Sequence, residues 1–235
     1  MSDSALPLGS FAYSSGLESY IAHHKPLPKG LTPLASFHRF LDLSIASVAG
    51  TTIPYLLAAH RNPGELEQLD NDLDASTPCV VARRASIAQG LALLGVWERS
   101  FRTPNSPTDN SPEASSLNLF SNALKGGPED EFPVNGHFAP LWAVVARSMG
   151  LDASQSAYVF LVNHAKAILS AAVRASVMGP YQAQAVLRSR QLQVLVTECI
   201  ETEWSTKPED AVQVAPALDL WLGRHELLYS RIFNS

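Results

Sequence analysis

The sequence has few of the features that mark a site of chemistry. Its two cysteines, Cys79 and Cys199, lie far apart and outside any CxxC or His/Cys cluster, so we interpret both as reduced structural residues. It has no GxxxxGK[ST] phosphate loop, and no Ser/His/Asp order or paired carboxylates typical of catalysis. The sequence therefore predicts no catalytic residue, no metal site and no cofactor.

Basic residues are not in excess either. The chain has 17 Lys and Arg against 22 Asp and Glu, a formal net charge of -5, which argues against a nucleic-acid or anionic-membrane binder. No N-terminal run is basic and then apolar, as a signal peptide would be, so we expect a cytoplasmic protein. The most apolar helix expected has an unbroken apolar run only from Ala157 to Val162, which is too short to span a membrane.

The histidines show no metal-binding spacing. His23 and His24 are adjacent, so their side chains diverge by about 100° on a helix and cannot chelate one ion together. The other five form no arrangement of His and carboxylates typical of a metal-binding helix. We interpret all seven as structural or surface residues.

Helical periodicity is the dominant pattern, and no alternating strand pattern persists anywhere. We therefore predict an all-α fold, a single-domain helical bundle over residues 1–235, around a buried central helix at 155–177. Asp152 and Gln155 form a capping pair before that helix, and Gly179-Pro180 ends it and starts the next. Polar side chains fall in one narrow stripe of this helix, at Ser156, Asn163, Lys166, Ser170 and Arg174.

Other segments have helical spacing too. One helix is expected from Leu34, and Ile53-Pro54 is expected to end or kink it. Pro78 opens a long helix. Residues 103–133 are rich in Pro, Ser, Asn and acidic residues around a short apolar island at 117–124, so we expect a flexible surface insertion there.

Three stretches resemble the urease accessory protein F (UreF) family, in its eukaryotic, fungal-like form. LPLGSFAYSSGLESYI (6–21) is similar to the family's N-terminal pattern, and RHELLYSRIFNS (224–235) to its terminal signature. The middle, from His137 through GLDASQSAYVFL to the Gly179 region, is similar to its central helices. A further match is Arg83-x-x-Ser86-x-x-x-Gly90.

The resemblance implies a non-catalytic, dimer-forming adaptor in the urease maturation complex. It would bridge the UreD/UreH-type accessory protein, which docks on apo-urease, and the nickel-carrying GTPase UreG, and so assist lysine carbamylation and nickel insertion. An alternative is a regulator of GTP hydrolysis by UreG, with an arginine such as Arg83 acting as a finger. A third reading, a metal carrier, lacks a clustered ligand set.

The resemblance also places partner-binding residues at the two chain ends and at one internal position, namely Phe11, Tyr13, Glu18, Arg83, Tyr229, Ser230, Arg231 and Phe233. A chain end ordinarily frays, and it has little reason to hold aromatics and an arginine unless something covers them. We expect this tail to dock on the UreD/UreH-type partner and to order on binding. The alternative is that Phe233 folds back onto its own bundle.

Overall fold

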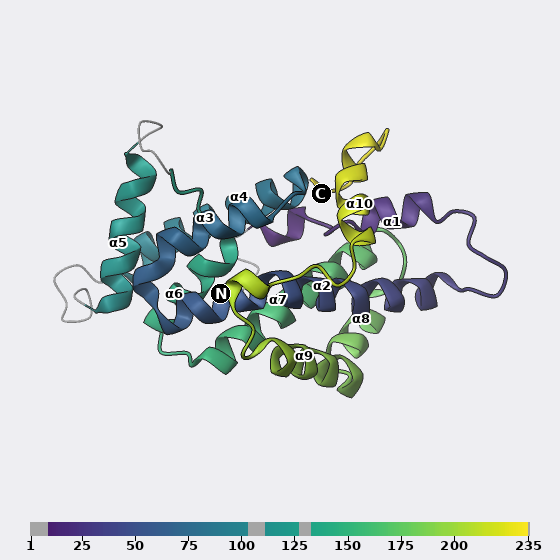
Figure 1. Cartoon of the computed structure of the whole chain (residues 1–235). Helices are drawn as coiled ribbons and strands as arrows, with labels where there is room; N and C mark the ends of the chain where they lie inside the picture. Colours follow the sequence, from purple (N-terminus) through teal and green to yellow (C-terminus); the bar gives the residue numbers. More distant parts are fainter. Residues whose placement is uncertain (1–8, 103–110, 127–132, 235) are drawn as a thin grey trace.

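The structure is a computed structural model that describes residues 9–102, 111–126 and 133–234. These residues form helices and no strand, which confirms the predicted all-α class (Figure 1). The α-helices are α1 (Leu17–His23), α2 (Pro33–Arg61), α3 (Leu66–Ser76), α4 (Val80–Val96), α5 (Pro112–Lys125), α6 (Phe138–Ser148), α7 (Ala153–Arg174), α8 (Pro180–Leu187), α9 (Arg190–Glu203) and α10 (Ala217–Arg224).

The bundle has a buried central helix, but it is α2 rather than the predicted 155–177. Helix α2 runs through the molecule and packs against α3, α6, α7, α9 and α10 (Figure 1). Helix α7 is more peripheral, because Tyr158 and Lys166 face solvent. A mostly apolar wheel marks a helix that is largely buried, and several helices of one bundle can meet that description.

Pro54 lies inside α2 and does not end it, so of the two predicted outcomes, an end or a kink, the end is wrong. A proline has no N–H, and it therefore leaves the carbonyl four residues earlier, that of Gly50, without its helical donor. The backbone N–H of Val212 donates to this carbonyl at 3.2 Å. A distant segment thus satisfies the group that Pro54 orphans, and the helix continues.

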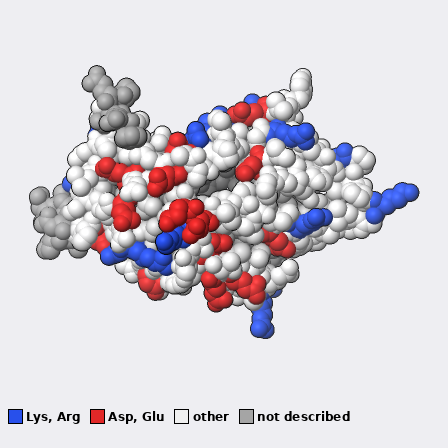
Figure 2. All heavy atoms as spheres, in the orientation of Figure 1, with Lys and Arg blue, Asp and Glu red and all other residues white. Residues whose placement is uncertain are grey.

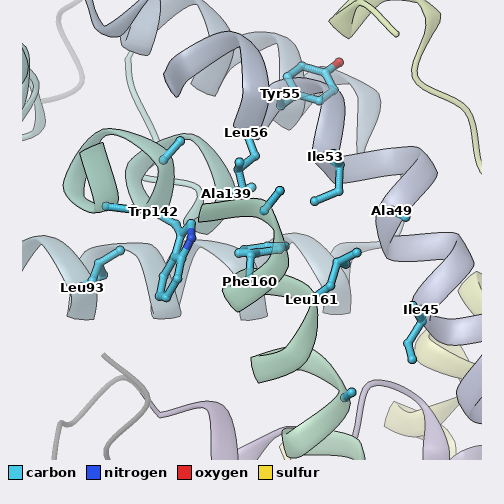
Figure 3. Packing of buried hydrophobic residues seen from close by; sticks show 14 of the residues in the cluster. Ile45, Ala49, Ile53, Tyr55, Leu56, Leu93, Ala139, Trp142, Phe160 and Leu161 are labelled. Carbon is cyan, nitrogen blue, oxygen red and sulfur yellow. The ribbon is translucent and has the colours of Figure 1, made fainter. Parts of the chain in front are cut away.

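Helix α6 is buried along almost its whole length and forms the second layer of the core. The Trp142 ring lies 6.0 Å from that of Phe160 on α7, and both face residues of α2 such as Leu56 (Figure 3). The indole N–H of Trp142 donates to the carbonyl of Ser156 at 3.2 Å, so burial leaves no polar group of this ring unpaired.

The start of α7 follows the sequence signals, but its end does not. Asp152 and Gln155 form the capping box, each side chain bonded to the backbone N–H of the other residue. Pro180 occupies the first turn of α8, directly after Gly179. The capping pair and the start of α8 are confirmed, whereas α7 already ends at Arg174 and not at Gly179.

The expectation of an unstructured insertion at 103–133 is wrong for residues 111–126. Helix α5 begins after Ser111, whose hydroxyl accepts a hydrogen bond from the backbone N–H of Ala114 at 3.1 Å. Leu117 and Phe120 of α5 are fully buried. Helix α5 packs on α6, so its apolar island belongs to the core. The rest of the predicted insertion, 103–110 and 127–132, lies outside the described residues.

Helices α2 and α7 are long and apolar enough to cross a membrane by length and composition alone. The rest of the fold covers 67% of the most apolar stretch of α2 and 50% of that of α7. Core helices of a soluble protein pass the same test, so these two helices are weak support for a membrane span.

Candidate partner-binding surface at the joined chain ends

The N-terminal segment packs directly against the C-terminal one. Helix α1 contacts α10, and both lie at one end of the molecule, opposite α5 (Figure 1). Gly16 has φ +84°, and a Cβ there would lie 3.3 Å from the backbone nitrogen of Leu222. Glycine therefore permits both the left-handed backbone and the close approach of α10.

The carboxylate of Glu18 binds the chain's last residues. It accepts hydrogen bonds from the backbone N–H of Ile232 at 2.7 Å, from that of Phe233 at 3.2 Å and from Nε2–H of His225 at 2.9 Å. The Glu18 side chain is only 12% exposed and that of His225 is fully buried. Hydrogen bonds to a charged group contribute about 1.5–3 kcal/mol each, so this contact fixes the tail.

Phe233 is part of the fold. Its side chain is 4% exposed, and the Arg174 guanidinium lies 4.2 Å from its ring centroid. Arg174 also donates to the carbonyl of Phe11, and the backbone N–H of Asn234 donates to the carbonyl of Ala12 at 2.8 Å. The tail therefore folds back onto its own bundle, the alternative that the sequence left open, and the picture of a frayed tail is wrong.

The folded tail leaves a group of large side chains in solvent. We call them the end surface: Phe11, Leu227, Tyr229, Arg231 and Ile232, all exposed. Exposed apolar residues are unremarkable singly, but Leu227, Tyr229 and Ile232 lie within six residues of chain, and Arg174 links this tail to Phe11. Such a concentration is typical of a protein–protein interface. Tyr, Phe and Arg are also enriched at interface centres.

A cavity of about 650 Å³ lies beside the N-terminal turn, between α2, α4, α7 and α10. Most of its wall is apolar, and one wall residue is His164, whose Nε2 lies 3.0 Å from the Ser44 hydroxyl. Burial lowers the pKa of His164 to about 4, so its imidazole is neutral at physiological pH. The cavity therefore presents neutral hydrogen-bonding groups at this histidine.

Comparisons with known proteins show the family of the chain. The UreF family profile matches residues 32–191. This chain belongs to the UreF family. A Schizosaccharomyces pombe protein named "Uncharacterized urease accessory protein UreF-like" is 36% identical over 100% of this chain and 94% of its own length. The Arabidopsis thaliana "Urease accessory protein F" is 32% identical over 99% and 89%, and an Actinobacillus pleuropneumoniae "Urease accessory protein UreF" 25% over 99% and 95%.

In this UreF-family protein, most of the residues predicted at the chain ends lie together. Phe11, Tyr229, Ser230 and Arg231 are exposed there, whereas Glu18 and Phe233 hold the tail from beneath. Tyr13 is half-buried and lines the cavity. The sequence missed Leu227 and Ile232 as surface residues and Arg174 as their support. Only the placement of Arg174 on the polar stripe of its helix hinted at this role.

Arg83 does not join the end surface. Its guanidinium donates to the carbonyls of Asp74 and Thr77 at 3.1 and 2.8 Å, and its Nε lies 3.3 Å from the Asp74 carboxylate. The same carboxylate lies 3.1 Å from Nε2 of the buried His137. Arg83 thus ties α4 to α3, and it is not free to act as an arginine finger in this UreF-family fold.

Charge is distributed unevenly over the surface. Acidic side chains outnumber basic ones over the middle of the face drawn in Figure 2, and several basic side chains project from its edges. On the end surface the exposed charge is that of Arg231, with Arg224 also exposed on the preceding helix. Glu226 is paired with Arg84 at 2.7 Å. The end surface is therefore apolar with a positive rim, on a chain of net charge -5.

Proposed function

We propose that this protein is a non-catalytic adaptor in urease maturation. It binds the UreD/UreH-type accessory protein on apo-urease and the GTPase UreG, and so supports lysine carbamylation and nickel insertion. Nickel is the cargo of this assembly rather than a cofactor of the chain. The adaptor works in the cytoplasm and pairs with a second copy of itself in the complex.

The observation that carries this proposal is the end surface. The fold uses a buried carboxylate, Glu18, and the cation of Arg174 to hold a tail that nevertheless exposes Tyr229 and Ile232. A tail with only a structural role would need the buried Phe233 and not the exposed side chains around it. A partner that covers them would remove apolar surface from water, which favours association.

The absence of clustered ligands is consistent with an adaptor. Over residues 9–102, 111–126 and 133–234, no group of three His, Cys, Asp or Glu side chains is placed to hold a metal ion. The relatives are named urease accessory proteins, and this name fits a protein that assists another enzyme. The GTPase-regulator alternative loses its candidate finger, because Arg83 is engaged within the fold.

The test is co-purification of the full chain with a UreD/UreH-type protein, apo-urease and UreG, followed by urease activation with nickel. The wild type should join the complex and raise urease activity. Tyr229→Ser combined with Ile232→Ser should weaken the complex, whereas Leu119→Ser, at an exposed position of α5 at the opposite end, should not. A wild-type chain that joins no such complex contradicts the proposal. An adaptor should also leave the rate of GTP hydrolysis by UreG unchanged.

A further inference from the structure

Glu18 is the point at which the two chain ends converge. Its carboxylate takes three hydrogen bonds: one from the His225 imidazole and two from the backbone N–H groups of Ile232 and Phe233. The two backbone bonds exist only while the tail is folded back. The charge on Glu18 therefore acts on the tail's position and on His225, in the helical turn that precedes the tail.

The other fixed points of the tail lie within the same few residues. They are the Asn234 N–H on the Ala12 carbonyl and the Phe233 ring under Arg174. Residues 229–231 are exposed between these contacts and the last helical turn. Without the Glu18 carboxylate, the backbone N–H groups of Ile232 and Phe233 lose their acceptor, and the exposed side chains of the tail lose a fixed position.

We propose that Glu18 is a latch: it assembles the end surface from the two chain ends, and the assembled surface fits a partner with an apolar centre and an acidic rim. This inference rests on the proposed adaptor function and names what the adaptor's partner must look like. The apolar centre is Phe11, Leu227, Tyr229 and Ile232, all exposed.

The acidic rim follows from charge complementarity. Arg224 and Arg231 are exposed and belong to none of the ion pairs found among the described residues, and Arg174 adds a positive charge over the Phe233 ring. Two carboxylates that contact the C-terminal segment or belong to it are already engaged, Glu226 with Arg84 and Glu18 with the tail. Positive groups around an apolar centre select a partner of opposite charge and repel a basic one.

Glu18→Gln tests the latch with the smallest change of shape. The amide keeps one accepting oxygen but places an NH₂ group against donors that need an acceptor, and it removes the charge. Hydrogen exchange of the Ile232 and Phe233 amides should accelerate by at least about tenfold, since each lost charge-assisted bond corresponds to roughly that factor. Affinity for a purified UreD/UreH-type protein should fall by at least about tenfold for the same reason.

Two controls separate the latch from general weakening. Glu201→Gln removes an exposed carboxylate from α9, and it should change neither the tail exchange nor the affinity. Leu117→Ala destabilises α5, at the far end of the molecule, so it lowers the melting temperature without touching the tail (Figure 1). It should leave the affinity within about twofold of wild type once measured well below the melting transition.

A disulfide between the tail and the N-terminal segment tests whether the position of the tail determines the affinity for the partner. The backbone bond between Asn234 and Ala12 brings these two residues side by side, so a disulfide from Ala12→Cys and Asn234→Cys can hold the tail closed. In a background of Cys79→Ser and Cys199→Ser, the oxidised tether should restore the affinity of Glu18→Gln, and reduction should abolish the rescue.

The rim is tested separately by Arg231→Glu and Arg231→Lys. The first should lower affinity and reverse its dependence on salt, and the second should keep both. The latch is overturned if Glu18→Gln leaves the hydrogen exchange of the Ile232 and Phe233 amides unchanged. It is also overturned if their exchange becomes faster but the affinity for the UreD/UreH-type protein stays the same. A wild-type chain that binds no UreD/UreH-type protein defeats the adaptor function instead, while the exchange measurement still decides whether Glu18 holds the tail.

Discussion

At the scale of single residues, the buried polar groups carry most of the information about this fold. Asp70 is fully buried on α3, and its carboxylate accepts hydrogen bonds from the backbone N–H groups of Asn135, Gly136 and His137 at 2.5–3.1 Å. Glu18 does the same for the C-terminal tail. In both cases a carboxylate on one helix satisfies backbone donors of a loop that is distant in sequence.

His164 makes stability depend on pH. Burial lowers its pKa from 6.5 to about 4, so the unfolded chain binds a proton more readily than the folded one. The part of the free energy of unfolding that depends on neutral His164 is fully present above pH 6.5. It is lost as the pH falls toward 4, by up to about 3 kcal/mol. Urea unfolding at pH 7 and pH 5 should show a larger loss for the wild type than for His164→Gln. Equal losses would contradict the assignment to this residue.

At the scale of elements, local signals predicted helix ends well and helix continuity poorly. The capping box of Asp152 and Gln155 and the start of α8 at Pro180 depend on neighbouring residues, so the sequence was sufficient for both. The passage of α2 through Pro54 depends on Val212, which is far away in sequence, and no local pattern shows that donor. Composition likewise hid α5, because the Pro- and Ser-rich residues around it outweigh its short apolar face.

The Gly50 contact gives a test of how α2 survives its proline. A Cβ at Gly50 would lie 2.7 Å from the backbone carbonyl oxygen of Val212, so Gly50→Ala must displace that segment. Although alanine is the better helix former by about 1 kcal/mol, we expect a net loss of about 1–3 kcal/mol from the displaced backbone. Gly223→Ala in α10, with open space around it, should be neutral or stabilising in the same unfolding measurement.

Helix α5 offers a matched pair of leucines on opposite faces. Leu117 is 0% exposed and Leu119 is 64% exposed, within one helix that α6 covers on one side. Leu117→Ala should cost about 2–5 kcal/mol through the lost contacts and the cavity, whereas Leu119→Ala should change stability by less than about 0.5 kcal/mol. Chemical denaturation monitored by circular dichroism measures both. If both substitutions changed stability by a similar, small amount, α5 would not be part of the core.

Deletion of residues 104–116 should destabilise the protein. It removes the Ser111 cap, the first turn of α5 and the 2.6 Å ion pair between Glu113 and Arg147 of α6. Burial opposes ionisation of Glu113, but hydrogen bonds from its backbone N–H and from Arg147 outweigh it and lower the pKa of the carboxyl. The deletion and the leucine pair thus address one question: how firmly α5 belongs to the core.

At the scale of the whole molecule, two chain segments that the sequence analysis selected as partner-binding meet in the fold. The family resemblance placed functional residues at 11–18 and 229–233, and the structure brings these segments together through Glu18 and Arg174. Periodicity could not predict the meeting, because contacts between the two ends of a chain leave no local pattern. The internal position, Arg83, belongs instead to a network with Asp74 and His137 that holds α3, α4 and the start of α6.

Truncation after Leu228 tests whether the tail serves the fold, the partner or both. The truncation removes the buried Phe233 and the two backbone hydrogen bonds to Glu18. Of the three hydrogen bonds to that carboxylate, only the one from His225 remains. We expect a loss of about 2–4 kcal/mol from these contacts, or roughly 5–15 °C in melting temperature for a domain of this size. Tyr229→Ser touches only a fully exposed side chain, so its melting temperature should match wild type. Both variants should fail to co-purify with the UreD/UreH-type partner. If Tyr229→Ser binds normally and only the truncation fails, the tail acts through the stability of the fold, and the exposed residues of the end surface are not the contact.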